Sequence, residues 1–167
     1  INGTASLKTA GQSYVSGVTI SGTQSETASA MINGEGHDFK VHAGARLDVG
    51  MNGAVRDVTV NSGGILQAAD GGSVSNVTLS AGAAASAVRD GKLTGVTVNN
   101  GAELYISGGS AASATVNGGG VMNVAARDGS YATVNSGGIQ YITGGNGAHA
   151  TLKAGAVQHA RGGYASN

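Results

Sequence analysis

The stretch ATVNSGGIQYITGGNGAH, residues 132–149, is one copy of a repeat that continues on both sides. ATVNGGGVMNVAARDGSY precedes it at residues 114–131, and ATLKAGAVQHARGGYASN follows it at residues 150–167. Earlier units begin at Phe39, Val58, Val77 and Val96, and the spacing between units is one residue shorter from residue 96 onward. A repeat of this length predicts a solenoid, in which each unit forms one rung of a coil.

The first three positions of the repeat alternate as expected for a strand with one buried face. Positions one and three are apolar in every regular unit. Position one holds Phe39, Val58, Val77, Val96, Ala114, Ala132 and Ala150, and position three holds Val41, Val60, Leu79, Val98, Val116, Val134 and Leu152. Position two holds Lys40, then Thr59, Thr78, Thr97, Thr115, Thr133 and Thr151. A period of two with many β-branched residues predicts a short β-strand whose Thr side chains face outward.

A glycine column marks the turn after this strand. It consists of Gly44, Gly63, Gly82, Gly101, Gly119, Gly137 and Gly155. Only Gly adopts positive φ freely, so we expect one backbone corner repeated in every rung. A second strand follows, with an inward column of Val49, Ala68, Ala87, Ile106, Val124, Ile142 and Ala160 and an outward column of Asp48, Gln67, Ser86, Tyr105, Asn123, Tyr141 and His159. A loose Gly-rich turn, such as residues 70–72, is expected to lead back to the next rung.

Equivalent strands one rung apart must stack in parallel, which predicts an all-β, right-handed parallel β-helix with 18–19-residue rungs. Left-handed β-helices also use a turn of this length, but they build it from three hexapeptides. The glycine column and the shortening of the repeat by one residue break such a pattern, which favours the right-handed form. We expect residues 1–167 to form a single β-solenoid domain, with irregular rungs over 1–38 and seven regular rungs over 39–167. The pattern starts and stops inside a repeat, so we expect an excerpt of a longer chain.

The composition excludes several classes of protein. Lys plus Arg number 9 and Asp plus Glu number 9, so the formal net charge is zero. A nucleic-acid-binding protein needs a basic surface to displace counterions from phosphates, and we therefore expect no nucleic-acid partner. Gly occurs 31 times and Pro not at all, which excludes a collagen-like chain. No apolar run approaches the roughly 18 residues of a membrane-spanning helix.

Three motifs that suggest ligands have simpler explanations. Glu35, His37, Asp38 and His42 are metal-ligating residue types, but they fall in an irregular turn region. The calcium-binding nonapeptide GGxGxDxUx nearly fits residues 144–152, yet its Asp position holds Asp57, Asn76, Gly95, Ser113, Tyr131, His149 and Asn167 along the rungs. Residues 145–150 resemble a dinucleotide fingerprint, but a strand follows them instead of a helix. We therefore expect no metal and no cofactor.

A carbohydrate-active enzyme is the alternative from a different class, because right-handed β-helices also carry lyases and hydrolases. Such enzymes gather several carboxylates on one face. Asp57, Asp90 and Asp128 recur beside Arg56, Arg89 and Arg127, and we place these pairs in return turns of rungs that are not adjacent. The acidic residues are too sparse for a catalytic groove, so we expect no catalytic residues and no enzyme. A purely structural spacer is the third hypothesis.

The rungs resemble a known family. The segment VNSGGIQYITGGNGAHAT, residues 134–151, is similar to the repeats of self-associating autotransporter adhesins, the diffuse-adherence adhesin and antigen 43 among them. The similarity covers residues 39–167 well and the first 38 residues loosely. It implies a passenger domain that is displayed at the Gram-negative cell surface through an outer-membrane barrel outside this excerpt. It also implies adhesion and autoaggregation through β-helix flanks, with a second copy or a host receptor or glycan as the partner.

The resemblance further implies modification by a heptosyltransferase. Acceptors that match the S-G-G and T-G-G turns are Ser62, Ser107, Ser136 and Thr143. For the contact face, zero net charge and outward polar columns lower the repulsion between identical coils. We expect this face to include Thr59, Thr78, Thr97, Thr115, Thr133 and Thr151, with Tyr105 and Tyr141 as anchors.

Overall fold

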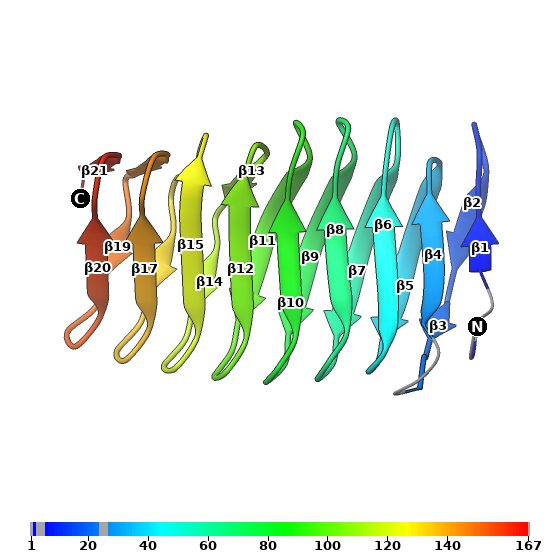
Figure 1. The fold of residues 1–167 in the computed structure, drawn as a ribbon, viewed down its shortest axis with the longest axis horizontal. Helices are drawn as coiled ribbons and strands as arrows, with labels where there is room; N and C mark the ends of the chain where they lie inside the picture. Colours follow the sequence, from blue (N-terminus) through cyan, green and yellow to red (C-terminus); the bar gives the residue numbers. More distant parts are fainter. Residues whose placement is uncertain (1, 3–5, 24–26, 167) are drawn as a thin grey trace.

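The computed structural model describes residues 2, 6–23 and 27–166, and this part of the chain is a parallel β-coil without helices (Figure 1). The chain rises through the front strands, crosses over and descends through the rear strands while it advances from the N-terminal to the C-terminal end. That path is a right-handed coil, so the predicted fold class is confirmed. No helix in the described residues is long and apolar enough to cross a membrane. Asn167, expected to complete the last rung, lies outside the described residues.

Nine strands form the front sheet of Figure 1, and every pair in it is parallel. In spatial order they are β1 (Ser6–Lys8), β4 (Ala28–Ile32), β6 (Ala45–Val49), β8 (Ile65–Ala68), β10 (Ala84–Ala87), β12 (Glu103–Ser107), β15 (Val121–Ala126), β17 (Ile139–Ile142) and β20 (Val157–Ala160). These strands are the predicted second strand of each rung. We call this layer the front sheet.

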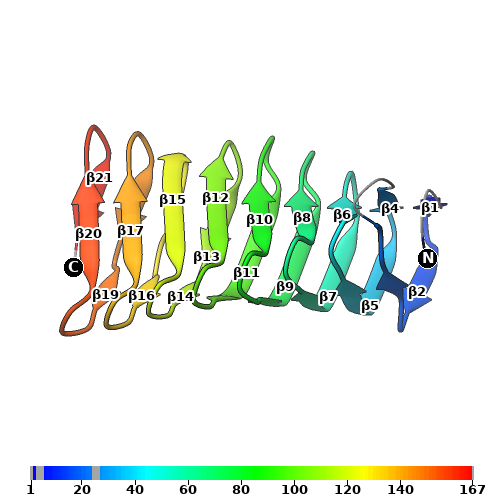
Figure 2. The same ribbon diagram turned by 60° about the horizontal axis from the view of Figure 1, so that its bottom comes forward.

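The second layer lies behind and below the first, as Figure 2 shows, and has ten strands. They are β2 (Tyr14–Ser16), β3 (Thr19–Ile20), β5 (Glu35–Val41), β7 (Ala54–Val60), β9 (Ser73–Leu79), β11 (Lys92–Val98), β13 (Ser110–Ala112), β14 (Thr115–Val116), β16 (Thr133–Val134) and β19 (Thr151–Leu152). We call this layer the rear sheet. A separate pair of parallel strands, β18 (Asn146–Ala148) and β21 (Tyr164–Ser166), extends the same row at the C-terminal end.

The rear sheet is bent along a line of residues with positive φ. Four rungs bend at Asp38, Asp57, Asn76 and Gly95, with φ of 58°, 59°, 53° and 62°, and later rungs bend at Ser113, Tyr131 and His149, with φ of 55°, 58° and 59°. The residues before the bend form a first limb, and those after it form a second limb that contains the Thr column. Asn, Asp and Gly tolerate this conformation best, which explains their frequency at the bend.

The first limb is a strand where the sequence predicted a turn. Residues 54–56, 73–75 and 92–94 were expected to belong to a loose return turn, but they are strands in register with one another. Rungs therefore have three strand segments rather than two, except the rung of residues 114–131, whose first limb makes only an isolated bridge at Asp128. The signal was present in the buried column Val55, Val74 and Leu93, whose members are one rung apart.

The glycine corner is confirmed at all seven positions. From Gly44 to Gly155 the column has φ between 67° and 81°. The backbone N–H of each glycine donates to the carbonyl of the next glycine along the coil, at 2.8–3.2 Å from Gly44 through Gly137. A side chain would strain this φ at every rung, so the corner needs glycine for conformational reasons.

The one-residue shortening of the later rungs occurs in the return turn between the front sheet and the first limb. Four residues (69–72) connect β8 to β9, and four (88–91) connect β10 to β11. Only three residues (107–109) separate Ile106, the last residue of the front sheet's buried column in β12, from Ser110 at the start of β13. The length change therefore leaves the strands of both sheets in register.

Two interior columns run along the coil, and both vary in size from rung to rung. The front sheet contributes Ala30, Leu47, Leu66, Ala85, Leu104, Met122 and Gln140, all buried. The first limb faces them with Gly36, Val55, Val74, Leu93, Ala111, Gly129 and Gly147, which are also buried. Where the first limb has glycine, a large neighbour occupies the space: a Cβ on Gly36 would lie 2.7 Å from Phe39 Cε2, and one on Gly147 would lie 2.3 Å from Ile142 Cδ1.

Candidate binding faces

The Thr column lies on the second limb of the rear sheet. Thr59, Thr78, Thr97, Thr115, Thr133 and Thr151 pair in register from rung to rung and are half-exposed or exposed. Asn side chains two residues after the Thr of their rung form a ladder beside this column. Asn117 Nδ2 donates to Asn99 Oδ1, and Asn135 Nδ2 donates to Asn117 Oδ1, both at 2.8 Å. This ladder holds neighbouring rungs together and was not anticipated.

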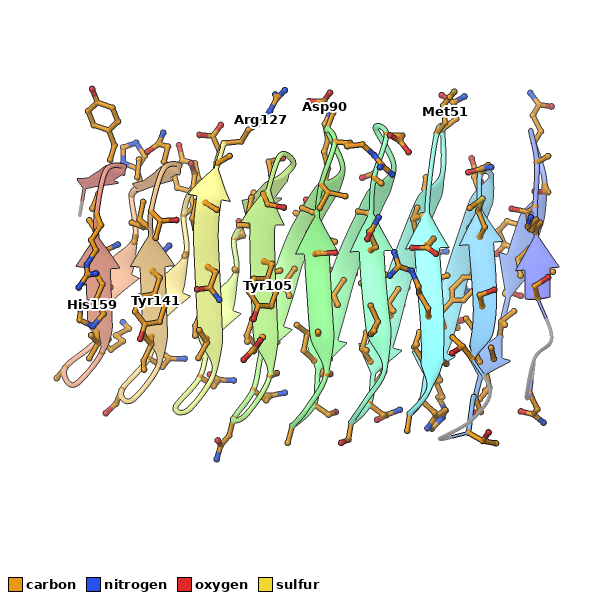
Figure 3. All side chains as sticks on the ribbon, viewed as in Figure 1. Met51, Asp90, Tyr105, Arg127, Tyr141 and His159 are labelled. Atoms are coloured by element: carbon orange, nitrogen blue, oxygen red, sulfur yellow. The ribbon has the colours of Figure 1, made fainter. Side chains whose placement is uncertain are left out.

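Tyr105 and Tyr141 lie on the front sheet, away from the Thr column (Figure 3). The structure therefore does not bring the eight predicted contact residues onto one face. Tyr141 stacks on His159 in the next rung, with ring centroids 5.2 Å apart and an interplanar angle of 12°. The hydroxyl of Tyr105 donates to the Glu103 carboxylate, and this hydrogen bond raises the pKa of Tyr105, with smaller contributions from desolvation and from the carboxylate's charge.

An apolar strip beside Tyr141 was missed. Val121, Ile139 and Val157 pair in register on the outward side of β15, β17 and β20. Val157 is 38% exposed and Tyr141 is 37% exposed. The strip and Tyr141 together form a continuous run of outward apolar side chains on the front sheet. The signal was a β-branched residue at the same repeat position in the last three rungs.

The four predicted glycosylation acceptors are all exposed, but they occupy two different edges of the coil. Ser62 and Ser136 each precede a glycine of the corner between the rear and front sheets. Ser107 and Thr143 lie at the opposite edge, where the front sheet ends in the return turn. Accessibility therefore does not distinguish among them.

The Glu35, His37, Asp38 and His42 cluster is dispersed around the bend. Glu35 and His37 are on the first limb of β5, and Asp38 is the bend residue itself. His37 Nδ1 lies 2.5 Å from Asp38 Oδ2, while His42 Nδ1 lies 3.4 Å from Asn61 Nδ2. Within the described residues no three His, Cys, Asp or Glu side chains are grouped so that they could hold a metal ion.

The Arg and Asp pairs are arranged differently from the prediction. Asp57 is not in a return turn: it is the bend residue of β7, paired with Arg56 at 2.9 Å. At the return-turn edge, Arg89 pairs with Asp70 of the preceding rung at 2.9 Å. Arg127 reaches Asp90 at 2.6 Å, and both lie along the upper edge in Figure 3. The carboxylates of Asp57, Asp70 and Asp90 thus form salt bridges within and between rungs.

A groove of about 480 Å³ follows the bend of the rear sheet over four rungs. Polar side chains supply most of its lining: Asp38, Lys40, Asp57, Thr59, Asn76, Thr78 and Thr97, together with Gly95 and the apolar Phe39, Val58 and Val77. Asp57 Oδ1 accepts a hydrogen bond from Asn76 Nδ2 at 3.1 Å, so the two neighbouring bend residues are fixed relative to each other. Sequence reasoning missed this groove because it treated the bend as part of a turn.

Comparison with known proteins yields a structural relative. No protein-family profile matches the sequence, and no curated protein matches it. The fold is similar to the crystal structure of the TibC-catalysed, hyper-glycosylated TibA55-350 fragment, with a TM-score of 0.63. The superposition covers 100% of this chain and 72% of the TibA fragment, at 24% sequence identity. The likeness extends over the whole coil and concerns the fold.

Proposed function

We propose that this chain is an adhesive segment of an autotransporter passenger, displayed at the bacterial cell surface and acting through the flank of its β-helix. Two lines of support are the repeat resemblance and the similarity of the whole coil to the TibA fragment. The observation that carries the proposal is the apolar strip of Val121, Ile139 and Val157 beside Tyr141 on the front sheet. An outward, regularly spaced apolar strip on a coil of zero net charge favours contact with a second surface.

The contact we propose is homotypic, between the front sheets of two coils. Val, Ile and Tyr side chains supply area that loses water on contact, and Tyr adds a hydroxyl for hydrogen bonding. Short outward residues such as Ser86 and Asn123 lie between the strip and the larger exposed side chains of Met31 and Ile65 on the same sheet. We propose no catalytic role for this chain.

We also propose that the coil is glycosylated by a partner glycosyltransferase of the heptosyltransferase type. The similar TibA fragment is hyper-glycosylated by TibC. In this chain, Ser62 and Ser136 offer exposed hydroxyls at the corner before the front sheet, and Ser107 and Thr143 offer them where the front strands end. Glycans at these two edges would flank the apolar strip rather than cover it.

The experiment is display of the full-length protein on cells, with settling and binding to host cells as the readouts. Ile139→Lys places a charge in the middle of the apolar strip and should abolish settling and attachment. Thr133→Lys places the same charge on the rear sheet and is the matched control, which should settle like the parent. If parent cells stay dispersed and bind no surface, the adhesive role is wrong and a spacer explains the coil. Turnover of a polysaccharide by the purified protein would instead favour the enzyme alternative.

A further inference from the structure

The bend of the rear sheet combines two features that a chain of sugars requires. The first is the polar groove of about 480 Å³, which presents carboxylate, amide, ammonium and hydroxyl groups on successive rungs. The second is an aromatic pair further along the same line of bend residues, Tyr131 and His149, stacked with centroids 5.1 Å apart and an interplanar angle of 14°. Tyr131 is 62% exposed, so the pair is accessible.

The line from groove to aromatic pair is continuous in the backbone. Asp38, Asp57, Asn76, Gly95, Ser113 and Tyr131 occupy the same bend position in six consecutive rungs. With rungs about 4.8 Å apart, the five intervals between them span about 24 Å. Gly95 and Ser113 are the smallest residues in the line, so the bend residues between the groove and the aromatic pair add little bulk.

We propose that this bend binds a linear, neutral polysaccharide that runs parallel to the axis of the coil. A polymer whose unit length is close to the rung spacing can meet an equivalent set of polar groups at each rung. Sugar hydroxyls both donate and accept hydrogen bonds, which matches a lining of Asp, Asn, Thr and Lys. The exposed ring of Tyr131 offers an apolar face for the C–H side of a sugar ring.

The carboxylates of the groove are oriented before any ligand arrives. His37 holds Asp38, and Arg56 and Asn76 both hold Asp57. Two contacts occupy only part of the four lone-pair positions of the Asp57 carboxylate, so it can still accept hydrogen bonds from ligand hydroxyls. Lys40 and Arg56 balance the charges of Asp38 and Asp57, so the groove has no excess of positive charge that would select an anionic polymer. This balance favours a neutral ligand over an acidic one.

This site rests on the proposed adhesive role and adds to it a ligand class and a second surface. The polysaccharide site and the homotypic contact can be tested separately. The apolar strip is on the front sheet, whereas the bend belongs to the rear sheet. Loss of cell settling with glycan binding intact would overturn only the homotypic contact. Settling without glycan binding would overturn only the polysaccharide site.

The test is calorimetric titration of the purified chain with cellohexaose and maltohexaose, with polygalacturonate as the anionic comparison. We expect binding of a neutral hexasaccharide and none of polygalacturonate. Asp57→Asn keeps a residue that tolerates positive φ and should weaken binding about tenfold, the loss of one charge-assisted hydrogen bond. Its matched control is Asp70→Asn: Asp70 also has positive φ, 51°, and an arginine partner at 2.9 Å, but it lies outside the groove.

A second pair of variants tests the aromatic end. Tyr131→Asn removes the ring, again with a residue that tolerates positive φ, and should also weaken binding about tenfold. Tyr141→Asn removes an equivalent Tyr from an equivalent Tyr–His stack on the front sheet and should leave binding unchanged. Absence of binding by the parent chain, or equal losses in a variant and its control, would overturn the proposal. Self-association of the purified chain that Asp57→Asn abolishes, without glycan binding, would assign the groove to a second copy and overturn it too.

Discussion

The rungs of residues 39–113 and the rungs of residues 114–166 enclose the same coil with different side chains. In the earlier rungs the first limb contributes Val55, Val74 and Leu93 to the interior, whereas Gly129 and Gly147 replace them in the later rungs. The interior stays filled, because Met122, Val124 and Ile142 of the front sheet occupy the space that Cβ atoms on those glycines would need. Close packing constrains the total volume of the interior side chains in each rung, and no single column is constant in size along the coil.

At the N-terminal end, Gly36 and Phe39 repeat the arrangement of the later rungs, in which a glycine of the first limb lies against a large side chain. Substitutions at this pair should give the largest change in stability. Gly36 faces Phe39 there, whereas Val55 and Val58 stand at the same positions one rung later. Phe39→Val should lower the free energy of unfolding by about 3 kcal/mol through a cavity. Gly36→Val should lower it by a similar amount, about 3 kcal/mol, through overpacking.

The double variant distinguishes exchange of volume from independent losses. Gly36→Val with Phe39→Val reproduces the residues of the next rung, and its total loss should be less than about 2 kcal/mol because the two changes compensate. Urea titration of the far-ultraviolet circular dichroism measures all three variants. Additive losses would show that the two positions do not share space.

The glycines of the first limb in the later rungs predict a smaller loss of stability on substitution. Gly147→Ala would place a Cβ 2.3 Å from Ile142 Cδ1 and should cost about 2 kcal/mol by overpacking. Adding Ile142→Val removes the colliding methyl and should recover about half of that loss. The comparison position is Ala111, equivalent to Gly147 two rungs earlier, where the Cβ is already accommodated. A neutral Gly147→Ala would mean that Ile142 rearranges freely.

The same contrast explains which parts of the fold were predictable. Strands with a constant buried column, such as Val58 to Val60, and the glycine corner follow from local rules of alternation and positive φ. The first limb did not, because its inward column changes from Val55 to Gly147 and reads as a turn when taken alone. Its glycines are buried because Met122 and Ile142, on the front sheet of the same rung, fill the space beside them.

The candidate faces were predictable only residue by residue. A period of two correctly puts Thr78 and Tyr141 on outward sides of strands. The prediction that they share one face was wrong. Which strands share a face depends on the angles at the corners of the rung, and the residues of one column do not determine those angles. The groove was missed for the same reason, since it exists only where positive φ at Asp38, Asp57 and Asn76 bends the rear sheet.

Gln140 is a buried amide at the position where the earlier rungs have Leu47, Leu66 and Leu104. Its Nε2 contacts Met122 Sδ at 3.8 Å, and its Oε1 accepts from Gln158 Nε2 at 2.7 Å. Gln140→Leu restores the earlier column and should change the unfolding free energy by less than about 1 kcal/mol, because half-buried Gln158 can turn its amide to water. Gln140→Ala leaves a cavity as well and should cost about 3 kcal/mol. A large loss for the Leu variant in urea titration would show that the amide pair itself stabilises the later rungs.

The bend gives the smallest effect and the only expected gain. Ser113 takes φ of 55° at the position where the earlier rungs have Asp57, Asn76 and Gly95. A Ser in this region carries a steric cost of about 1 kcal/mol, and Asn recovers part of it because its side chain bonds locally to the backbone. Ser113→Asn should therefore raise the unfolding free energy by about 0.5 kcal/mol and increase the Tm slightly in a calorimetric scan. Ser75→Asn, in the first limb of β9, is the control and should not stabilise, since Asn is unfavourable in extended strands. Equal gains in stability for both variants would show that the added amide, and not relief of strain at positive φ, is the cause.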